Sequence, residues 1–278
     1  MPEPEASQLE IEAVLFDVNG TLRRREPHTP TQQKAAARLS KLLNKEDVSQ
    51  ADWDQMASCY RNYVNWAQEN EIQLSEAEVW TRWILPEYPG EQIAPVASEL
   101  TLAWSELKGR AVPQPGAEAM LAALKQRGYR LGIISNSLST LDIPGSLEAF
   151  GWQGYFDVVV LSSMFRVRKP APELFLEAAR RLNMEPKQCA YVGNRILRDI
   201  AGCKRAGYAQ GILIQMPGAQ PSGEPEPGSQ PDRVIHALGE LLNLFPDRRQ
   251  SRRQASGQPD SRPGGCWPPT GARPRRGT

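Results

Sequence analysis

The segment DVNGT at residues 17–21, which directly follows the apolar run AVLF at residues 13–16, constrains this chain most. A short continuous apolar run is typical of a strand that is buried on both faces of a parallel sheet. Asp17 therefore lies where a strand ends and a glycine-containing loop begins. Since ligands of open α/β sheets bind beyond the carboxyl ends of the strands, Asp17 is placed to attack an electrophile.

Five short apolar runs predict strands, and helical patterns separate the last four of them. This alternation predicts an α/β fold in which a parallel sheet carries helices on both faces. The runs lie at residues 13–16, 131–134, 158–161, 190–192 and 212–214.

The long stretch between the first two predicted strands, about residues 30–110, carries no strand signal. Its apolar residues recur at helical spacing, and Ser75 with Glu78 forms a capping box, so we expect four amphipathic helices. A small bundle inserted after the first strand would lie over the carboxyl end of the sheet as a lid. Near the other end of the chain, we expect Asp232 to cap a final helix that runs to Phe245.

These patterns divide the chain into three parts. We expect a core domain at residues 11–28 and 112–245, a helical cap domain at residues 29–111 and a tail at residues 246–278. The tail holds eight Arg against two Asp and has no Ile, Leu, Val or Phe. Such a segment cannot bury enough apolar surface to offset its ordering entropy, which predicts disorder.

Composition favours a globular protein of the cytoplasm. Of the 278 residues, 40% are hydrophobic, and no run approaches the roughly 20 apolar residues that span a bilayer. The acidic first residues fit neither a signal nor a transit peptide, and four cysteines without CxxC spacing fit reduced thiols. We expect no membrane partner, and nucleic acid is an improbable one although the tail is basic. The sequence does not indicate the oligomeric state.

Chemically useful side chains follow four of the predicted strands. A parallel sheet brings these strand ends to one rim, where a carboxylate, a hydroxyl, an ammonium and a second carboxylate would meet. That set suits phosphoryl transfer, with nucleophilic attack by Asp17 and stabilisation of the phosphoryl oxygens by the other groups. The groups are Asp17, Ser135 with Asn136, Lys169, and Asn194 with Asp199.

At these positions the chain resembles the haloacid dehalogenase superfamily of hydrolases, in its helical-cap branch. The resemblance covers about residues 11–245 and rests on four segments in order: FDVNGTL (16–22), ISN (134–136), RKPAPE (168–173) and VGN (192–194) with Asp199. It implies a Rossmann-like core, an aspartyl-phosphate intermediate, a small phosphorylated substrate and Mg²⁺. By this resemblance Asp17, Asn19 and Lys169 occupy catalytic positions. The implied substrate-binding residues are Thr21, Ser135, Asn136 and Arg195, and the implied metal positions are Asp17, Asn19, Asn194 and Asp199.

Two departures from the family pattern weaken the predicted site. Asn19 stands where the phosphatases have the acid that protonates the leaving group and then activates water, and an amide does neither near neutral pH. Asn194 replaces a metal-binding carboxylate by a neutral amide oxygen, so Mg²⁺ should bind weakly. Arginines close to the motifs could compensate by binding phosphate. They are Arg23, Arg24, Arg25, Arg166, Arg168, Arg195 and Arg198.

Three functions fit this sequence. The first is a metal-assisted phosphatase with reduced catalytic power, which favours substrates with good leaving groups. The second is a non-catalytic protein that keeps an anion pocket, and the two asparagines motivate it. The third is hydrolysis of a carbon–halogen bond, as in the 2-haloacid dehalogenase branch, which needs no metal but has a different residue at position 19 and a different fourth motif.

Overall fold

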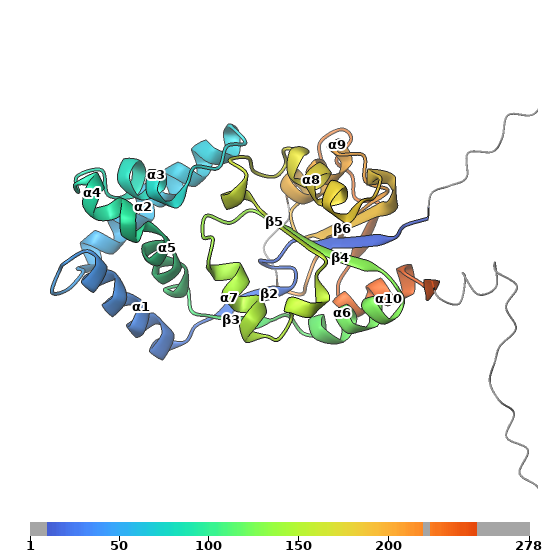
Figure 1. The fold of residues 1–278 in the computed structure, drawn as a ribbon, viewed down its shortest axis with the longest axis horizontal. Helices are drawn as coiled ribbons and strands as arrows, with labels where there is room; N and C mark the ends of the chain where they lie inside the picture. Colours follow the sequence, from blue (N-terminus) through green and yellow to red (C-terminus); the bar gives the residue numbers. More distant parts are fainter. Residues whose placement is uncertain (1–9, 219–222, 249–278) are drawn as a thin grey trace, which may run out of the picture.

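The computed structural model describes residues 10–218 and 223–248. Six parallel strands form its central sheet in the order β5-β4-β1-β6-β7-β8, and this confirms the predicted α/β fold with a parallel sheet (Figure 1). All five predicted apolar runs are strands of this sheet. The strands are β1 (Ala13–Phe16), β4 (Arg130–Ser135), β5 (Val158–Leu161), β6 (Cys189–Gly193), β7 (Gln210–Ile214) and β8 (Arg233–Ile235).

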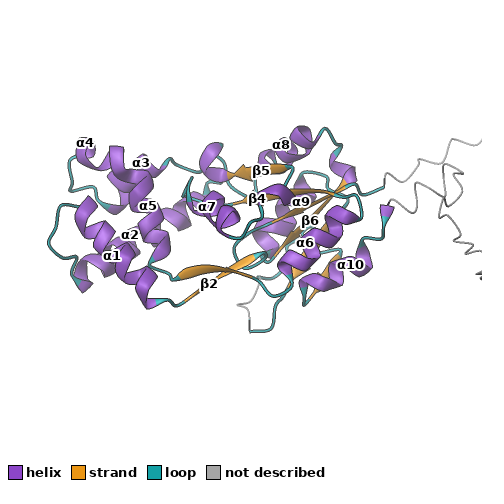
Figure 2. Ribbon diagram, turned by 60° about the horizontal axis from the view of Figure 1, so that its bottom comes forward, coloured by secondary structure: helices purple, strands orange, loops and turns teal. Residues whose placement is uncertain are grey.

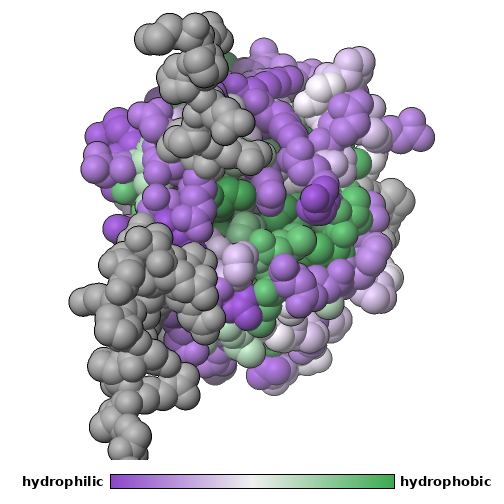
Figure 3. Space-filling model, turned by 90° about the vertical axis from the view of Figure 1, so that its right-hand side faces the viewer, coloured by the Kyte–Doolittle hydropathy of each residue, from purple (hydrophilic) through white to green (hydrophobic). Residues whose placement is uncertain are grey.

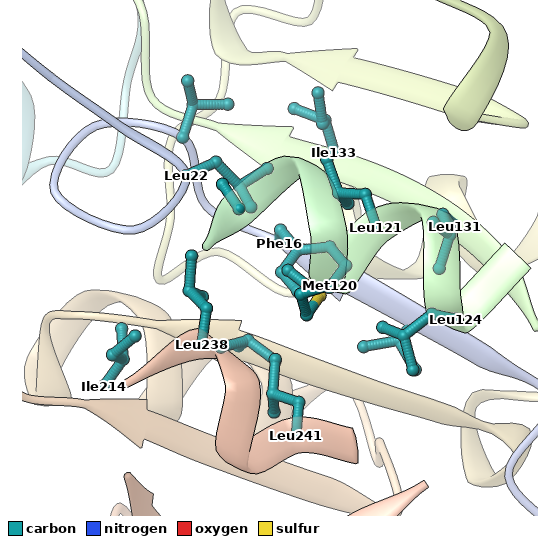
Figure 4. Packing of buried hydrophobic residues seen from close by; sticks show 14 of the residues in the cluster. Phe16, Leu22, Met120, Leu121, Leu124, Leu131, Ile133, Ile214, Leu238 and Leu241 are labelled. Atoms are coloured by element: carbon teal, nitrogen blue, oxygen red, sulfur yellow. The ribbon is translucent and has the colours of Figure 1, made fainter. Parts of the chain in front are cut away.

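Strand β1 is central because its alternate side chains enter two separate hydrophobic cores. Val14 and Phe16 face α6 (Ala117–Gln126), α7 (Asp142–Ala149) and α10 (Leu241–Leu244). Figure 4 shows Phe16 beside Met120, with Leu238 and Leu241 approaching from the far end of the chain. Ala13 and Leu15 face the opposite layer, which contains α8 (Glu173–Leu182) and α9 (Ala201–Arg205). Burial on both faces explains why this strand is continuously apolar.

The segment between β1 and β4 forms a separate group of helices, here called the helical unit, which lies to one side of the sheet (Figures 1 and 2). It has its own hydrophobic core around Leu39, Tyr63 and Trp80. The predicted capping box forms, since Ser75 Oγ accepts from the backbone N–H of Glu78 and the Glu78 carboxylate accepts from that of Ser75. The unit consists of α1 (Thr29–Leu42), α2 (Gln50–Glu69), α3 (Glu76–Val79) with a π-helical turn at Trp80–Ile84, α4 (Gly90–Ile93) and α5 (Ala97–Glu106).

Three elements differ from the sequence-based expectation. Strands β2 (Arg23–Glu26) and β3 (Arg110–Pro113) pair antiparallel and connect the helical unit to the core. The charged RRRE of β2 and the short RAVP of β3, which is exposed at both ends, gave no strand signal. The last predicted apolar stripe of the helical unit is divided between α4 and α5, with a 3₁₀ turn between them.

The predicted long helix after Asp232 is wrong, because the chain forms β8 there and only the short helix α10 follows. The reason lies in the contacts of the Asp232 carboxylate. It accepts from Lys204 Nζ and from the backbone N–H of Gly211 at the edge of β7, and it does not cap a helix. The expected disordered tail begins at residue 246, and residues 249–278 lie outside the described part.

The two ends of the sheet differ in character. Strands end on the side of the helical unit, whereas the opposite end shows a continuous area of hydrophobic residues framed by polar ones (Figure 3). Polar groups able to do chemistry are therefore expected between sheet and helical unit. Within the described residues, no helix is long and apolar enough to cross a bilayer, and Cys59, Cys189 and Cys203 are free thiols.

The core of the helical unit yields a test of stability. Trp80 is fully buried, and its Nε1 donates a 2.8 Å hydrogen bond to Thr101 Oγ1. We expect Trp80→Ala to lower the free energy of unfolding by about 3–5 kcal/mol, because it leaves a large cavity. Urea unfolding followed by circular dichroism measures the loss, and Leu176→Ala at an exposed position serves as control. A loss below about 1 kcal/mol for Trp80→Ala would contradict this packing.

Candidate active site

The site is built where β1, β4 and β6 end side by side. Phe16 pairs in register with Ile133 of β4 and with Val192 of β6, so Asp17 emerges between these two neighbouring strands. Its carboxylate is buried, and Oδ1 accepts from Ser135 Oγ at 3.2 Å. Two of the predicted site residues are thus in direct contact although they are far apart in the sequence.

Lys169 connects the predicted residues to one another. Its buried ammonium lies 2.8 Å from Asp17 Oδ1 and 2.7 Å from Asp199 Oδ1. It also donates to the backbone oxygen of Ile134 at 2.9 Å and to the hydroxyl of Tyr191 at 2.7 Å. One cation between two carboxylates compensates the desolvation cost of both, and its other contacts fix its position.

Tyr191 supports this lysine from strand β6. Burial raises the pKa of Tyr191 well above its ordinary value, and the nearby carboxylates of Asp199 and Asp17 raise it further. The phenol therefore stays neutral, and it donates to the backbone oxygen of Ile134 at 2.7 Å while accepting from Lys169. Sequence reasoning missed this residue, because a tyrosine within an apolar strand reads as core.

Asp199 is held from the loop after β6. Its Oδ2 accepts from the backbone N–H groups of Asn194, at 3.1 Å, and Arg195, at 2.9 Å. Burial opposes its charge, but the charges of Lys169 and Arg198 outweigh burial, and the pKa of Asp199 is lowered on balance. Gly193 allows this approach, since a Cβ there would lie 2.5 Å from the Cβ of Asp199. The carboxylate is thus held by two backbone N–H groups at Oδ2 and by the Lys169 ammonium at Oδ1.

Three other predicted residues have different surroundings. The Asn136 side chain forms two hydrogen bonds with the backbone of Lys169. It donates to the carbonyl oxygen at 3.0 Å and accepts from the N–H at 2.8 Å. Asn136 therefore acts as a positioning residue for Lys169. It also lines a cavity between the helical unit and the core. Thr21 is buried, and its hydroxyl has no hydrogen-bond partner within the described residues. Arg195 acts on Asp199 through its backbone, and a substrate-binding role for its side chain remains a prediction.

Asn19 belongs to a network that the sequence did not reveal. Arg23 Nε donates to Asn19 Oδ1 at 3.0 Å, which directs the amide NH₂ group away from Arg23. Arg23 is itself buried and is fixed by Ser146 and by the carboxylate of Asp142, which also pairs with Arg25. Burial opposes the charge of Asp142, but the two arginines outweigh it and lower the pKa of this carboxyl. Asn19 lines the cavity between the helical unit and the core, and its amide oxygen is already used by Arg23.

The other arginines near the motifs divide between the site and the surface. Arg198 lies beside the site, with its Nε 3.9 Å from Asp199 Oδ1 and without a hydrogen-bond partner in the described part of the chain. Burial opposes its charge, but Asp199 and Asp17 outweigh burial and raise the pKa of Arg198. Arg24 and Arg166 bind Glu26 and Glu78 near the surface. Arg198 is therefore the arginine best placed beside the two carboxylates.

Two buried oxygens could receive a cation. Asp17 Oδ2 and Asn194 Oδ1 are buried and have no hydrogen-bond partner within residues 10–218 and 223–248. The Asn194 side chain packs directly on Gly20, where a Cβ would collide with its amide group. Both oxygens are of the kind that divalent cations prefer, but only the one of Asp17 carries a negative charge. The described residues hold no cluster of three or more His, Cys, Asp or Glu side chains that could bind a metal.

The helical unit contacts the loop that carries Lys169. Ile72 forms an antiparallel bridge with Val167, and the backbone N–H of Arg168 donates to the carbonyl oxygen of Glu71 at 2.9 Å. Side chains also meet here, since Gln73 Oε1 accepts hydrogen bonds from the side chains of Arg168 and Ser162. The residue before the catalytic-type lysine is thus fixed by the helical unit.

The ion pairs of Lys169 predict a pH-dependent effect on stability. We expect Lys169→Met to lower the free energy of unfolding by about 3–5 kcal/mol at pH 7, because it leaves buried carboxylates without their partner. In the wild type, the lowered pKa of Asp199 stabilises the fold above the ordinary pKa of about 4, and this stabilisation is lost as pH falls. In the variant, the charge of Lys169 is missing, so burial prevails and raises the pKa of Asp199. The variant's loss of stability relative to the wild type therefore shrinks as pH falls.

Urea unfolding at pH 7 and pH 5 measures this difference. The difference in the free energy of unfolding between Lys169→Met and the wild type should be smaller at pH 5 than at pH 7. Lys204→Met, which removes a more exposed pair with Asp232, is the matched control and should cost less than about 1 kcal/mol at both values. An equal difference in the free energy of unfolding at pH 5 and pH 7 would argue that the buried carboxylates do not cause the loss of stability.

Comparisons with known proteins agree with this geometry. Glyceraldehyde 3-phosphate phosphatase of Methanopyrus kandleri is 38% identical over 132 residues, which cover 48% of this chain and 56% of that protein. Phosphoglycolate phosphatase of Nitrosococcus oceani is 30% identical over 140 residues, which cover 47% of this chain and 56% of that protein. The chain thus spans about half the length of these relatives.

A solved structure shows the same fold over most of the chain. The 2-haloacid dehalogenase from Pseudomonas syringae superposes with a TM-score of 0.61 at 22% identity and covers 84% of this chain and 97% of that one. The family of haloacid dehalogenase-like hydrolases matches residues 11–207, which include Asp17, Ser135, Lys169 and Asp199. Because this match extends over well more than half of its residues, the chain belongs to the haloacid dehalogenase-like hydrolase family.

Proposed function

We propose that this protein hydrolyses phosphate monoesters of small metabolites through a phosphorylated Asp17, with the helical unit acting as a cap over the site. The observation that carries the proposal is the ammonium of Lys169 between the carboxylates of Asp17 and Asp199, next to the hydroxyl of Ser135. Both relatives described above are named phosphatases of small phosphorylated compounds, which supports the same substrate class.

In the first step the Asp17 carboxylate attacks phosphorus, and the bond to the leaving oxygen breaks. Ser135 and Lys169 are within reach of the phosphoryl oxygens, because both already contact Asp17. Arg198 adds a second positive charge beside Asp199. Fixed positive groups of this kind stabilise the charge that moves onto the phosphoryl oxygens in the transition state.

We further propose that Mg²⁺ binds weakly at this site. Asp17 Oδ2, the amide oxygen of Asn194 and the backbone oxygen of Asn19 would hold it, and Asp199 would add its charge nearby. When bound, the ion would neutralise charge on the phosphoryl group. With an amide in place of one carboxylate, the site attracts Mg²⁺ less strongly than a site with the full set of acids.

The leaving group and the attacking water receive little help from this chain. The amide of Asn19 accepts from Arg23 and can donate only a hydrogen bond, so it neither gives nor takes a proton. General acid–base help is worth about 10²–10⁴-fold, and its absence favours leaving groups that need no proton. Acyl and aryl phosphates are therefore the expected substrates of highest turnover.

A second candidate function is anion binding without catalysis. The observation that favours it is the pair of asparagines at positions 19 and 194, which stand where the phosphatases of the family have an acid–base catalyst and a metal-binding carboxylate. Hydrolysis of an aryl phosphate with Mg²⁺ and with EDTA decides between the two. Turnover that Asp17→Asn abolishes supports the phosphatase, whereas phosphate-dependent thermal stabilisation without turnover supports the binding protein. Chloride release from a 2-haloacid would instead indicate a dehalogenase.

The change Asn19→Asp tests the missing acid directly. The new carboxylate would lie beside Arg23, which keeps it ionised and suits it to activate water. We expect turnover of an aryl phosphate to rise about 10- to 100-fold, and that of an alkyl phosphate to rise less, because its leaving group still lacks a proton donor. Steady-state kinetics on both substrates measures this, with Asn44→Asp, outside the site, as control. Unchanged or lower turnover would show that position 19 does not face the reacting phosphate.

The change Asn194→Asp tests the cation site. It restores a charged oxygen next to Gly20 with almost no change of shape. We expect the affinity for Mg²⁺ to rise about tenfold or more, since affinity follows the charge of the ligands. Calorimetric titration with Mg²⁺ measures binding without turnover, and Asn183→Asp at a helix end is the control. Equal affinity in Asn194→Asp and the wild type would exclude this amide from the cation site.

A further inference from the structure

A cavity of about 300 Å³ opens between the helical unit and the core, directly beside the reacting groups. Asn19 and Asn136, which adjoin the site of Asp17 and Ser135, form part of its lining. Its volume corresponds to about ten water molecules, which admits only a small leaving group. Since it adjoins the nucleophile, the cavity is the place where the non-phosphate part of a substrate would lie.

The charges around this cavity do not balance. Asp142 is the one carboxylate in its described lining, and both of its oxygens are bound to arginines, Arg23 and Arg25. Lys108 also lines the cavity, and the described residues place no carboxylate within 4 Å of its ammonium group. Two cations of the lining, Arg25 and Lys108, thus face one anion, and among the described residues Lys108 is the one of the two without an ion pair.

Other acidic residues of the connecting segments do not compensate for Lys108. Glu106 pairs with Arg38, and Glu26 pairs with Arg24, both away from the cavity. The nearest aromatic partner is Tyr60, whose ring centroid lies 5.5 Å from Lys108 Nζ. Although much of the Lys108 side chain is exposed, burial of its ammonium lowers its pKa, and the charge of Arg25 lowers it further, while the carboxylate of Asp142 acts in the opposite direction without outweighing them. An anion bound here would relieve the repulsion between these two cations.

We propose that the substrate carries a second negative charge, a carboxylate or a second phosphate on its leaving group, and that Lys108 binds this charge. The inference rests on the proposed function, because it names the substrate class of that same site. Arg25 is already engaged, since Asp142, Ser105 and the carbonyl oxygen of Gly109 bind its guanidinium, whereas the described residues give Lys108 no ion pair. Lys108 is therefore the specificity-determining residue of the cavity.

Matched substrates test this inference. Phosphoglycolate and 2-hydroxyethyl phosphate differ only in the carboxylate, and ethylene glycol bisphosphate carries a second phosphate there. We expect kcat/KM of the wild type to favour a doubly anionic substrate over the neutral one. Lys108→Met should reduce that ratio by about 10- to 100-fold, as expected for loss of a hydrogen bond to a charged group. Lys45→Met, a lysine of the helical unit that lines a different cavity, is the control.

Binding to the Asp17→Asn protein is measured in parallel by thermal unfolding, so that an inactive enzyme still gives an answer. Stronger stabilisation by phosphoglycolate or the bisphosphate than by 2-hydroxyethyl phosphate, abolished by Lys108→Met, supports the inference. Equal stabilisation by all three ligands, or a ratio that Lys108→Met leaves unchanged, overturns it. Absence of turnover with every phosphate, combined with selective binding, would overturn the proposed hydrolysis and leave the anion selectivity of Lys108 in place.

Discussion

The contact on which this structure depends is the buried ammonium of Lys169 between Asp17 and Asp199. It joins the end of β1 to the loop after β6, and its bond to the backbone of Ile134 adds β4. Removing the lysine would leave two buried carboxylates without this compensation. The same contact that closes the carboxyl edge of the sheet therefore also fixes the position of the Asp17 carboxylate.

The charge balance of the site explains how it tolerates two asparagines. The positive charges of Lys169 and Arg198 balance the negative charges of Asp17 and Asp199. These four side chains are therefore close to neutral together before any cation binds. Carboxylates at positions 19 and 194 would leave an excess of negative charge that a divalent cation must offset. In the proposed phosphatase, the asparagines would shift the site from reliance on a metal toward reliance on the side chains of the protein, and proton transfer is what this arrangement would lose.

Much of the fold could be predicted because strands buried on both faces, such as β1 and β5, are uninterrupted apolar runs. Strand β2 could not be predicted. Its sequence is arginine-rich, and its hydrogen bonds are made with partners that are distant in the sequence. In the site, Asp17 and Lys169 follow from their places after strands, and the structure brings them together. The role of Arg23 escaped prediction because its partner Asp142 lies 119 residues away, and Lys108 because its importance depends on which neighbouring charges are already paired.

The helical unit shapes the site at two separate places. Through Ile72 and Glu71 it holds the backbone just before Lys169, and through Lys108 it contributes a cation to the cavity. Arg25 joins the two regions, because it binds Ser105 at the end of α5 and Asp142 at the start of α7. A movement of the helical unit away from the sheet would thus disturb both the backbone before Lys169 and the lining of the cavity. If the proposed function holds, chemistry and substrate selection are therefore coupled in one closed arrangement of the chain.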